Sequence, residues 1–388
     1  MEIQAFSALH PRPDWYKELL SNRNSKLLRS MLEPPAGSGY KVMANEIMQN
    51  VKTLQQEGLY HAQTAPALYL YERETDGRSQ FGVWTITSLE EFSKGNIITH
   101  EDTLSDREKR LSTYRQQVGL EASPVLMTYP RDMKVNQLIE QASIRVPLQV
   151  DCCNGHTHRI WAITDSETIG QFTSAFRVIK NAYVADGHHR LAAALSLHNS
   201  DQPQWISTLY VSAGQLSCNA FHRMILTYSP TSESTLFNKL SSLFSIEPVS
   251  DNQPFRPAKA GCFGLLYKRQ WYRLDLKASS VHDSIPDVSL LQDHILEPIF
   301  GINDPRSDHR LSCWHNEQWG QLLQESAEHP NSIVFTLYPI GAAELMCLAT
   351  AKVKLPPKST YIQPKVPYGL LLYSSKTELH ALHKPDLS

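Results

Sequence analysis

The segment between residues 181 and 197 places the strongest constraint on the fold. Residues 181–185 form a short β-type run, and residues 191–195 are a run of strong helix formers. Only Asp186-Gly187-His188-His189-Arg190 separates the two runs, so a strand must pass into a helix across a very short turn. The glycine allows the backbone to take the unusual conformation that such a turn requires.

A turn of this kind is suited to binding an anion. The first backbone N–H groups of a helix lack intrahelical partners, and the helix dipole adds partial positive charge there. Arg190 offers a planar fork of donors that matches phosphate oxygens. His188 and His189 can donate hydrogen bonds or move protons near neutral pH. Asp186 can accept a proton, hold a metal-bound water or orient a histidine.

The same residues have an ordinary structural interpretation. Asp186 would cap the helix, the two histidines would be polar residues with satisfied hydrogen bonds, and Arg190 would pair with an acid. Motifs this short occur without a ligand, so the spacing by itself leaves both interpretations open.

The rest of the chain predicts an α+β fold. Two hairpins are predicted, one with residues 67–73 and 80–87 around Asp76-Gly77, the other with residues 262–267 and 271–276. Helical spacing occurs over residues 41–57, 169–179 and 236–243, and the highly charged residues 102–117 predict a solvated helix. Because hairpins and helices are mixed, we expect a mixed sheet with packed helices and not a regularly alternating parallel sheet.

Composition restricts the partners and the location. The 388 residues include 37 Lys+Arg and 39 Asp+Glu, a net charge of −2, which argues against a surface built to bind nucleic acid. No run of about 18 apolar residues is present, and the N-terminus lacks a signal-peptide pattern. The six cysteines form no C-x-x-C pair. We expect a cytoplasmic protein with reduced thiols and neither a nucleic-acid nor a membrane partner.

Several motifs, in order along the chain, resemble those of the uncharacterised family called domain of unknown function 1015. The resemblance covers about residues 65 to 373. It rests on the Asp186–Arg190 motif and on Thr99-His100-Glu101-Asp102-Thr103, His158-Arg159-Ile160-Trp161, Asp287-Val288-Ser289-Leu290-Leu291-Gln292-Asp293, Gly301-Ile302-Asn303-Asp304-Pro305-Arg306, Pro356-Pro357-Lys358-Ser359-Thr360 and Pro364-Lys365.

Three positions depart from the family pattern. His10 and His222 stand where the family usually has Arg and Asn, and Pro34-Pro35-Ala36-Gly37 replaces its Pro-Pro-Tyr-Asp segment. The resemblance therefore implies a divergent N-terminal segment at residues 1–64. It further implies a core containing the Asp-Gly-His-His-Arg loop at residues 65–228 and a C-terminal α+β part, packed on the core, at residues 229–388.

The Asp-Gly-His-His-Arg loop is also similar to loops of the ParB/sulfiredoxin-like superfamily. Members of that superfamily bind nucleotide phosphates with a Gly-x-x-Arg loop at a helix start, and some are kinases of free serine. The resemblance implies a ParB/sulfiredoxin-like core, a nucleotide partner, and Mg²⁺ with ATP or ADP as cofactors. It implies an enzyme, a small-molecule kinase whose first candidate substrate is serine. A phosphatase of phosphoserine or a similar metabolite and a nucleotide-binding regulatory protein without catalysis remain the alternatives.

The resemblance also implies roles for individual residues. Gly187, His188, His189 and Arg190 would bind the phosphates, together with Lys358, Ser359 and Thr360. Glu101, next to His100, would act on the acceptor hydroxyl, and Asp186 and His188 would complete the catalytic group. The alternative is that Glu101 is a surface carboxylate in a charged segment and that residues 356–360 form a loop stiffened by prolines, because no P-loop glycines precede Lys358.

Histidines allow a further, weaker interpretation. His156 and His158 would point to the same face of a strand, and with His188 or His189 they could bind zinc. No cysteine or acidic residue lies at a familiar zinc spacing from them. The sequence therefore leads us to assign no residue as a metal ligand.

Overall fold

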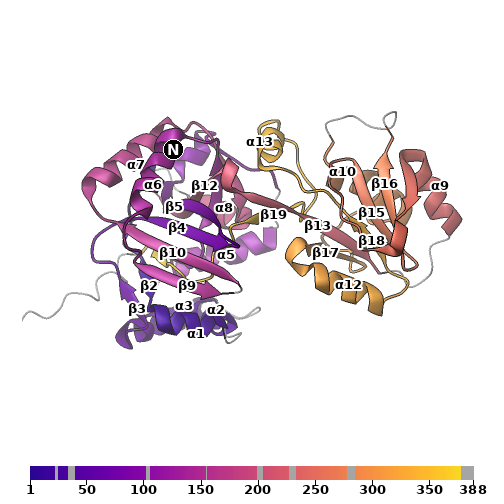
Figure 1. The fold of residues 1–388 in the computed structure, drawn as a ribbon. Coiled ribbons are helices and arrows are strands. Elements are labelled where there is room, and N and C mark those ends of the chain that lie inside the picture. Colours follow the sequence, from indigo (N-terminus) through magenta and orange to yellow (C-terminus); the bar gives the residue numbers. More distant parts are fainter. Residues whose placement is uncertain are drawn as a thin grey trace, which may run out of the picture. The chain divides into compact units, whose positions relative to one another are not determined.

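The chain folds into two compact units. The computed structural model describes residues 1–21, 25–33, 40–101, 105–153, 155–198, 204–226, 233–277 and 285–376. Unit 1 comprises Met1–Leu216 and Pro364–Ser388, and unit 2 comprises Ser217–Gln363 (Figure 1). The predicted boundary after residue 228 lies outside the described residues, and the predicted three-part division stays a prediction.

A mixed sheet forms the centre of unit 1, which confirms the α+β prediction. Its strands follow the order β6 (Ile97–Ile98), β11 (Ala182–Asp186), β8 (Val125–Tyr129), β12 (Trp205–Ser212), β5 (Arg78–Ser88), β4 (Leu68–Thr75), β10 (His156–Ile163) and β9 (Gln149–Cys153), and β1 (Ile3–Gln4) also pairs with β5. Strand β11 is parallel to β6, β12 is parallel to β8, and the other pairs are antiparallel. The β4–β5 hairpin turns at Asp76-Gly77, as predicted.

Helices pack on the sheet through buried apolar side chains. The helices of unit 1 are α1 (Pro13–Ser21), α2 (Ser25–Leu32), α3 (Tyr40–Gln56), α4 (Glu90–Ser93), α5 (Ser105–Gln117), α6 (Met133–Ser143), α7 (Ser166–Val178) and α8 (His188–Leu195). Val135 of α6, Phe172 of α7 and Leu191 of α8 belong to one core cluster with Met127 of β8. The side chain of Asp132 caps α6 by accepting a hydrogen bond from the backbone N–H of Val135. Asp165 caps α7 in the same way by accepting one from the backbone N–H of Thr168.

The C-terminal segment returns to unit 1 and is held there by backbone contacts. Strand β20 (Tyr373–Ser374) pairs with β7 (Leu120–Glu121), while β2 (Leu9–Pro11) pairs with β3 (Tyr60–Ala62). The Tyr16 hydroxyl donates to the carbonyl of Tyr368 at 2.6 Å, and the Tyr60 hydroxyl donates to that of Gly369 at 2.6 Å. These contacts place residues 364–376 beside the first part of the chain.

Unit 2 is built on an antiparallel sheet. Its strands follow the order β14 (Phe244–Pro248), β16 (Gln270–Leu276), β15 (Cys262–Tyr267), β18 (Ile333–Thr336), β13 (Ser217–Ile225) and β17 (Leu311–His315), and β19 (Thr360–Gln363) also pairs with β13. The described helices are α9 (Glu233–Leu243), α10 (Asp287–Leu291), α11 (Glu297–Phe300), α12 (Trp319–Glu328) and α13 (Ala342–Thr350). The β15–β16 pair confirms the second predicted hairpin.

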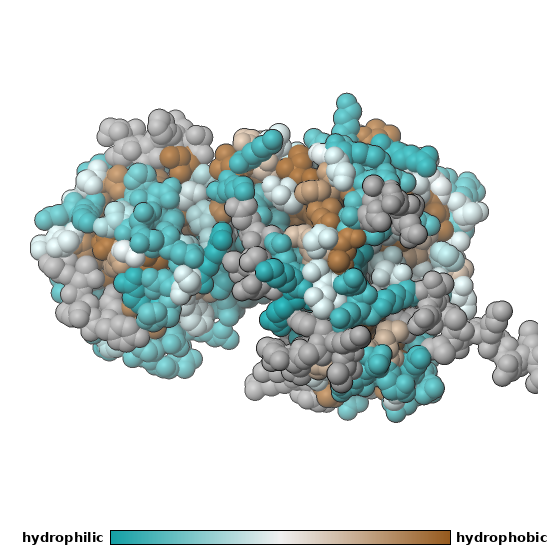
Figure 2. Space-filling model, turned by 180° about the vertical axis from the view of Figure 1, so that it is seen from behind, coloured by the Kyte–Doolittle hydropathy of each residue, from teal (hydrophilic) through white to brown (hydrophobic). Residues whose placement is uncertain are grey.

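The remaining helical segments are short. Single 3₁₀ turns occupy Ala213–Gln215, Ser250–Asn252 and Asn316–Gln318, and a π-helical turn at Gln292–Leu296 joins α10 to α11. Among the described residues, no helix combines the length and the apolar character needed to cross a membrane. Hydrophilic residues cover most of the face in Figure 2, and hydrophobic residues form small patches between them.

Candidate functional site

A strand passes into a helix where the sequence predicts it, but the turn is shorter than predicted, because Asp186 belongs to the strand and His188, His189 and Arg190 belong to the helix. Strand β11 ends at Asp186, Gly187 adopts φ 97° and ψ 23°, and α8 begins at His188. Gly187 itself is the N-cap, so the alternative in which Asp186 caps the helix is wrong. A Cβ atom on Gly187 would lie 2.7 Å from Nη2 and 2.9 Å from Nε of Arg190. The position therefore requires glycine for its positive φ and for the close approach of the arginine.

Two cations bind the carboxylate of Asp186. Arg190 Nη2 donates to Oδ2 at 3.2 Å, and Lys365 Nζ donates to Oδ1 at 3.0 Å. Burial would raise the pKa of Asp186, but the charges of Lys365 and Arg190 lower it below its ordinary value. The carboxylate is therefore ionised and orients the arginine. Arg190 does pair with an acid, as the structural interpretation expects, yet its buried Nε has no hydrogen-bond partner among the described residues.

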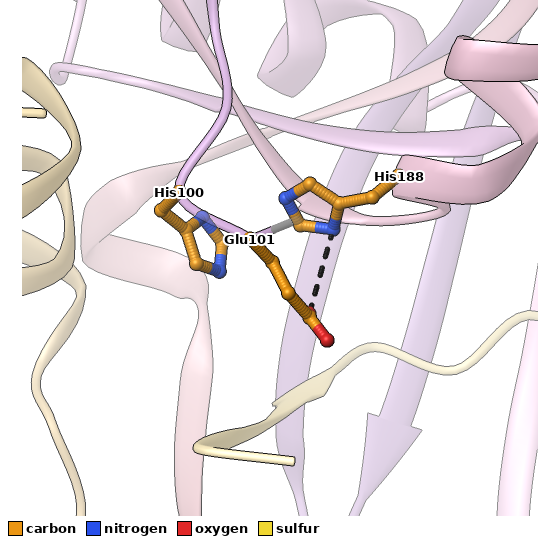
Figure 3. A group of neighbouring side chains, drawn as sticks. All are labelled: His100, Glu101 and His188. Atoms are coloured by element: carbon orange, nitrogen blue, oxygen red, sulfur yellow. Dashed lines mark ion pairs between the residues drawn. The ribbon is translucent and has the colours of Figure 1, made fainter. Parts of the chain in front are cut away.

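His100, Glu101 and His188 lie together (Figure 3). His100 and Glu101 follow β6, which runs parallel to β11, so both strands deliver their following residues to the same edge of the sheet. His188 Nδ1 lies 3.8 Å from Oε2 of Glu101, and the two imidazole centroids are 4.6 Å apart at an interplanar angle of 89°. One ligand atom from each of the three residues lies within 4.8 Å of the others.

Both imidazoles of this cluster are buried and neutral near pH 7. Burial lowers the pKa of His100 to about 4, against a smaller raising effect of a hydrogen bond to the backbone of Val184. Burial, reinforced by the nearby His100, lowers the pKa of His188 to about 3. The side chain of Glu101 is 36 % exposed, so the carboxylate is the part of the cluster that solvent reaches.

A cavity of about 990 Å³ adjoins these residues. Its lining includes the Asp186–Arg190 turn and Glu101, and helices α2 and α5 contribute further charged groups. The basic residues of the lining are Arg29, Arg107, Arg110, Arg115 and Arg190, and the acidic ones are Glu33, Glu101, Glu121 and Asp186. A cavity of this size with several guanidinium groups can accommodate an anion as large as a nucleotide.

The sequence of the chain matches one described protein family. A family model described as a protein of unknown function, DUF1015, matches residues 16–295, more than half of the sequence. The chain belongs to this family. The family expected from the motifs is thereby confirmed, although the match runs over residues 16–295 and not over about 65 to 373. No curated protein matches this DUF1015 protein.

Solved structures give weak likenesses to this DUF1015 protein. A free serine kinase in complex with AMP has a TM-score of 0.43 at 10% identity, covering 76% of this chain and 92% of that one. A conserved hypothetical protein from Pyrococcus furiosus has a TM-score of 0.39 at 11% identity, covering 76% and 96%. SbnI with C-terminal truncation from Staphylococcus aureus has a TM-score of 0.41 at 9% identity, covering 73% and 84%. The interpretation of the site therefore depends on its own geometry.

The other predicted phosphate ligands of the DUF1015 protein, Lys358, Ser359 and Thr360, belong to unit 2. The backbone carbonyls of Pro357 and Lys358 accept hydrogen bonds from Nη2 of Arg223, and the Ser359 hydroxyl donates to the carbonyl of Pro356. These contacts order the loop. A role of this loop in phosphate binding stays a prediction.

The zinc combination considered from the sequence is not assembled in the described part of the chain. His156 contacts Nη2 of Arg73 at 2.7 Å and Oγ1 of Thr75 at 2.8 Å. His158 Nδ1 lies 2.9 Å from the Tyr71 hydroxyl. Neither histidine belongs to the described group of three that could bind a metal, which is His100, Glu101 and His188.

Sequence reasoning missed two contributions to the site. Lys365 was noted as part of a terminal motif, but nothing in the sequence pairs it with Asp186. The charge pattern predicts a solvated helix for α5, and Arg107 and Arg110 are indeed exposed, but they also line the cavity, and Arg115 is mostly buried. Arg115 forms an ion pair with Glu121 and donates to the carbonyl of Trp205 at 2.6 Å. The density of arginines in residues 107–115 was the available signal.

Proposed function

We propose that this protein is a small-molecule kinase that transfers a phosphoryl group from ATP or ADP to the hydroxyl of a metabolite, with free serine as the first substrate to test. The turn between β11 and α8 is the observation that carries the proposal. There, a positive-φ glycine, the first turn of a helix and an arginine with an unpartnered Nε border one cavity. This combination is complementary to phosphate oxygens.

Nucleotide phosphates would bind across the start of α8. Gly187 permits close approach of the ligand to the backbone N–H groups of His188 and His189. Arg190, oriented by Asp186 and Lys365, would contact the phosphates from the side. Arg29, Arg107 and Arg110 add positive charge to the same cavity, and such charge stabilises a polyphosphate.

The carboxylate of Glu101 supports the catalytic part of the proposal. It lines the same cavity and is partly exposed, so an acceptor hydroxyl can approach it. In the transfer, the acceptor oxygen bonds to the terminal phosphorus, the bond from that phosphorus to the leaving nucleotide oxygen breaks, and Glu101 accepts the hydroxyl proton. Of the two histidines beside it, His188 is the closer described neighbour of its carboxylate.

Carboxylate oxygens near a phosphate site fit the requirements of Mg²⁺. Glu101 and Asp186 both line the cavity, and Mg²⁺ is usually held by one or two carboxylates together with substrate phosphates. When bound, the ion would neutralise charge on the nucleotide phosphates. Since both oxygens of Asp186 already bind cationic side chains and Glu101 is assigned the proton, the nucleotide phosphates would supply most of the ligands of this ion.

Calorimetry with a matched pair of arginine variants tests nucleotide binding. The full-length protein, Arg190→Ala and Arg177→Ala are titrated with ATP and ADP, with and without Mg²⁺. Arg177 is an exposed arginine of α7 that does not line the cavity, so its loss removes the same charge elsewhere on unit 1. We expect Arg190→Ala to abolish measurable binding and Arg177→Ala to leave it intact. Equal affinity in all three proteins would contradict the proposal.

Phosphorus NMR then separates the candidate reactions. Phosphoserine formed from serine and ATP or ADP supports the kinase. Phosphate released from phosphoserine without any nucleotide supports a phosphatase and contradicts the kinase. Nucleotide binding without turnover of any hydroxylated metabolite supports a regulatory nucleotide-binding protein.

A further inference from the structure

The geometry points to a metal site that goes beyond the proposed function: we propose that His100, Glu101 and His188 bind one divalent transition-metal ion of the zinc class. Three residues from two separate segments converge here, two imidazoles and one carboxylate. Their ligand atoms lie within 4.8 Å of one another, and the dashed line in Figure 3 marks the ion pair between His188 and the carboxylate of Glu101.

The distance between His188 Nδ1 and Glu101 Oε2 is close to the distance between two ligand atoms of one bound ion. Ligands bound at about 2.0–2.1 Å in tetrahedral geometry lie about 3.3 Å apart. His188 Nδ1 and Glu101 Oε2 are 3.8 Å apart, too far for a hydrogen bond and close to that separation. An ion between the two atoms would therefore draw them together by only a few tenths of an ångström.

Ring nitrogens of both histidines that lack hydrogen-bond partners are a second observation on this cluster. Nδ1 of His100 and Nε2 of His188 are buried, and neither has a hydrogen-bond partner among the described residues. The side chains of His100 and His188 belong to residues that are only 4% and 7% exposed. Burying a polar atom without a partner is unfavourable, so the bare Nδ1 of His100 indicates that something else binds there; the bare Nε2 of His188 lies across the ring from the Nδ1 that faces Glu101.

The surroundings of His100 are typical of a metal ligand. The backbone of Val184 lies beside the ring, and Nδ1 of His100 has no hydrogen-bond partner among the described residues. Histidine ligands commonly donate their second ring N–H to a backbone carbonyl, which fixes the tautomer and the ring orientation.

Another buried histidine shows the contrast. His222 in unit 2 also has a buried nitrogen without a partner among the described residues, but its charged neighbours are Arg223 and Arg256. Two guanidinium groups repel a cation. Arg190 also lies near His188, but the carboxylates of Asp186 and Glu101 give the His100–His188 cluster the negative charge that His222 lacks.

The kinds of ligand atom in the cluster indicate which class of metal ion it would bind. Two nitrogens and one carboxylate favour Zn²⁺, Co²⁺ or Mn²⁺, whereas Mg²⁺ prefers oxygen ligands alone. Three protein ligands also leave one position of a tetrahedral ion open. Because Glu101 borders the cavity, that open position would face a small oxygen ligand such as water or a hydroxyl.

The test measures metal binding and needs no enzyme activity. A negative result would therefore contradict the metal site without contradicting the kinase proposal, and the reverse also holds. The full-length protein is treated with a chelator, dialysed and titrated with Co²⁺ and Zn²⁺ by absorbance and calorimetry. We expect each chain to bind one equivalent of Co²⁺ or Zn²⁺. The Co²⁺ form should show visible d–d absorption bands and no thiolate-to-cobalt charge-transfer band. The last feature excludes the six cysteines as ligands.

Variants assign the ligands. Glu101→Gln and His188→Asn should each weaken Zn²⁺ binding at least about tenfold, and His222→Asn serves as the control that loses a buried imidazole elsewhere. Glu101→Gln keeps the side-chain shape at a partly exposed position, so it reports on the site even if a histidine variant unfolds. Absence of stoichiometric Zn²⁺ and Co²⁺ binding, a thiolate band, or wild-type affinity in Glu101→Gln would overturn the proposal.

Discussion

The ammonium of Lys365 donates to Oδ1 of Asp186 at 3.0 Å, across 179 positions of sequence. The other carboxylate oxygen accepts from Arg190 at 3.2 Å. Asp186 therefore sits between a lysine of the returning C-terminal segment and an arginine of α8. Residues 364–376 are for this reason part of the candidate site and not an appendage of unit 1.

Lys365→Met should weaken nucleotide binding without unfolding the protein. Without the lysine, both oxygens of Asp186 become available to Arg190, which would be drawn away from the phosphates. We expect a loss of about tenfold in affinity for ADP, because a charge-assisted hydrogen bond at a partly exposed position contributes about 1–1.5 kcal/mol. Calorimetry provides the measurement, with exposed Lys180→Met as the control. An unchanged affinity in Lys365→Met would remove Lys365 from the site.

Gly187→Ala should disturb both the fold and the site. Its Cβ would approach Nη2 of Arg190 to 2.7 Å, and φ 97° is strained for any residue with a side chain. We expect a loss of about 1–2 kcal/mol of unfolding free energy, together with weaker nucleotide binding.

Gly170→Ala is the matched control for this change. Gly170 lies on the exposed side of α7, and nothing lies within 4 Å of the added Cβ. Alanine there should stabilise the protein by about 0.5–1 kcal/mol. Denaturant unfolding of both variants measures the two effects, and a shift of the same sign in both would refute the assignment of strain to Gly187.

Glu101→Gln should separate catalysis from nucleotide binding. The amide cannot accept the hydroxyl proton, so kcat should fall by about 10²–10⁴-fold while the affinity for ADP stays close to that of the wild type. Initial rates of serine phosphorylation and ADP calorimetry are compared in the same preparation. If affinity and turnover fall together, Glu101 contributes to binding and is not the proton acceptor.

Asp287 should make the stability of unit 2 depend on pH. Burial raises the pKa of Asp287 to about 6. A hydrogen bond from the backbone N–H of Gly261 lowers this pKa by a smaller amount, and the negative charge of Glu344 raises it further. Between about pH 4 and pH 6 the folded form then holds a proton that the unfolded chain has lost. Stability should therefore fall as pH rises through this window, by up to about 3 kcal/mol.

Asp287→Asn should abolish that decrease, because the amide does not ionise and can still accept the hydrogen bond from Gly261. Denaturant unfolding at pH 4, 5 and 6 gives the comparison, with Asp251→Asn as an exposed control. A decrease of equal size in Asp287→Asn and in the wild type would place its origin at another group.

The sequence alone determined the local structure of the site and the α+β class. Periods of 2 and 3.6 residues distinguish strands from helices, and Gly187 between such runs indicates a turn because glycine adopts a positive φ without steric penalty. Hairpins at Asp76-Gly77 and at residues 262–276 follow from the same short-range rules.

Tertiary structure decided which charged groups meet. His100 and Glu101 reach His188 because β6 lies parallel to β11, and strand order is set by packing of the whole sheet. Lys365 reaches Asp186 because β20 pairs with β7 and returns the chain to unit 1. Arg107 and Arg110 of α5 are exposed as their sequence predicts and still line a cavity, whereas Arg115 is mostly buried. A charged residue indicates a polar environment, and only the surrounding fold determines whether that environment is solvent or a binding cavity.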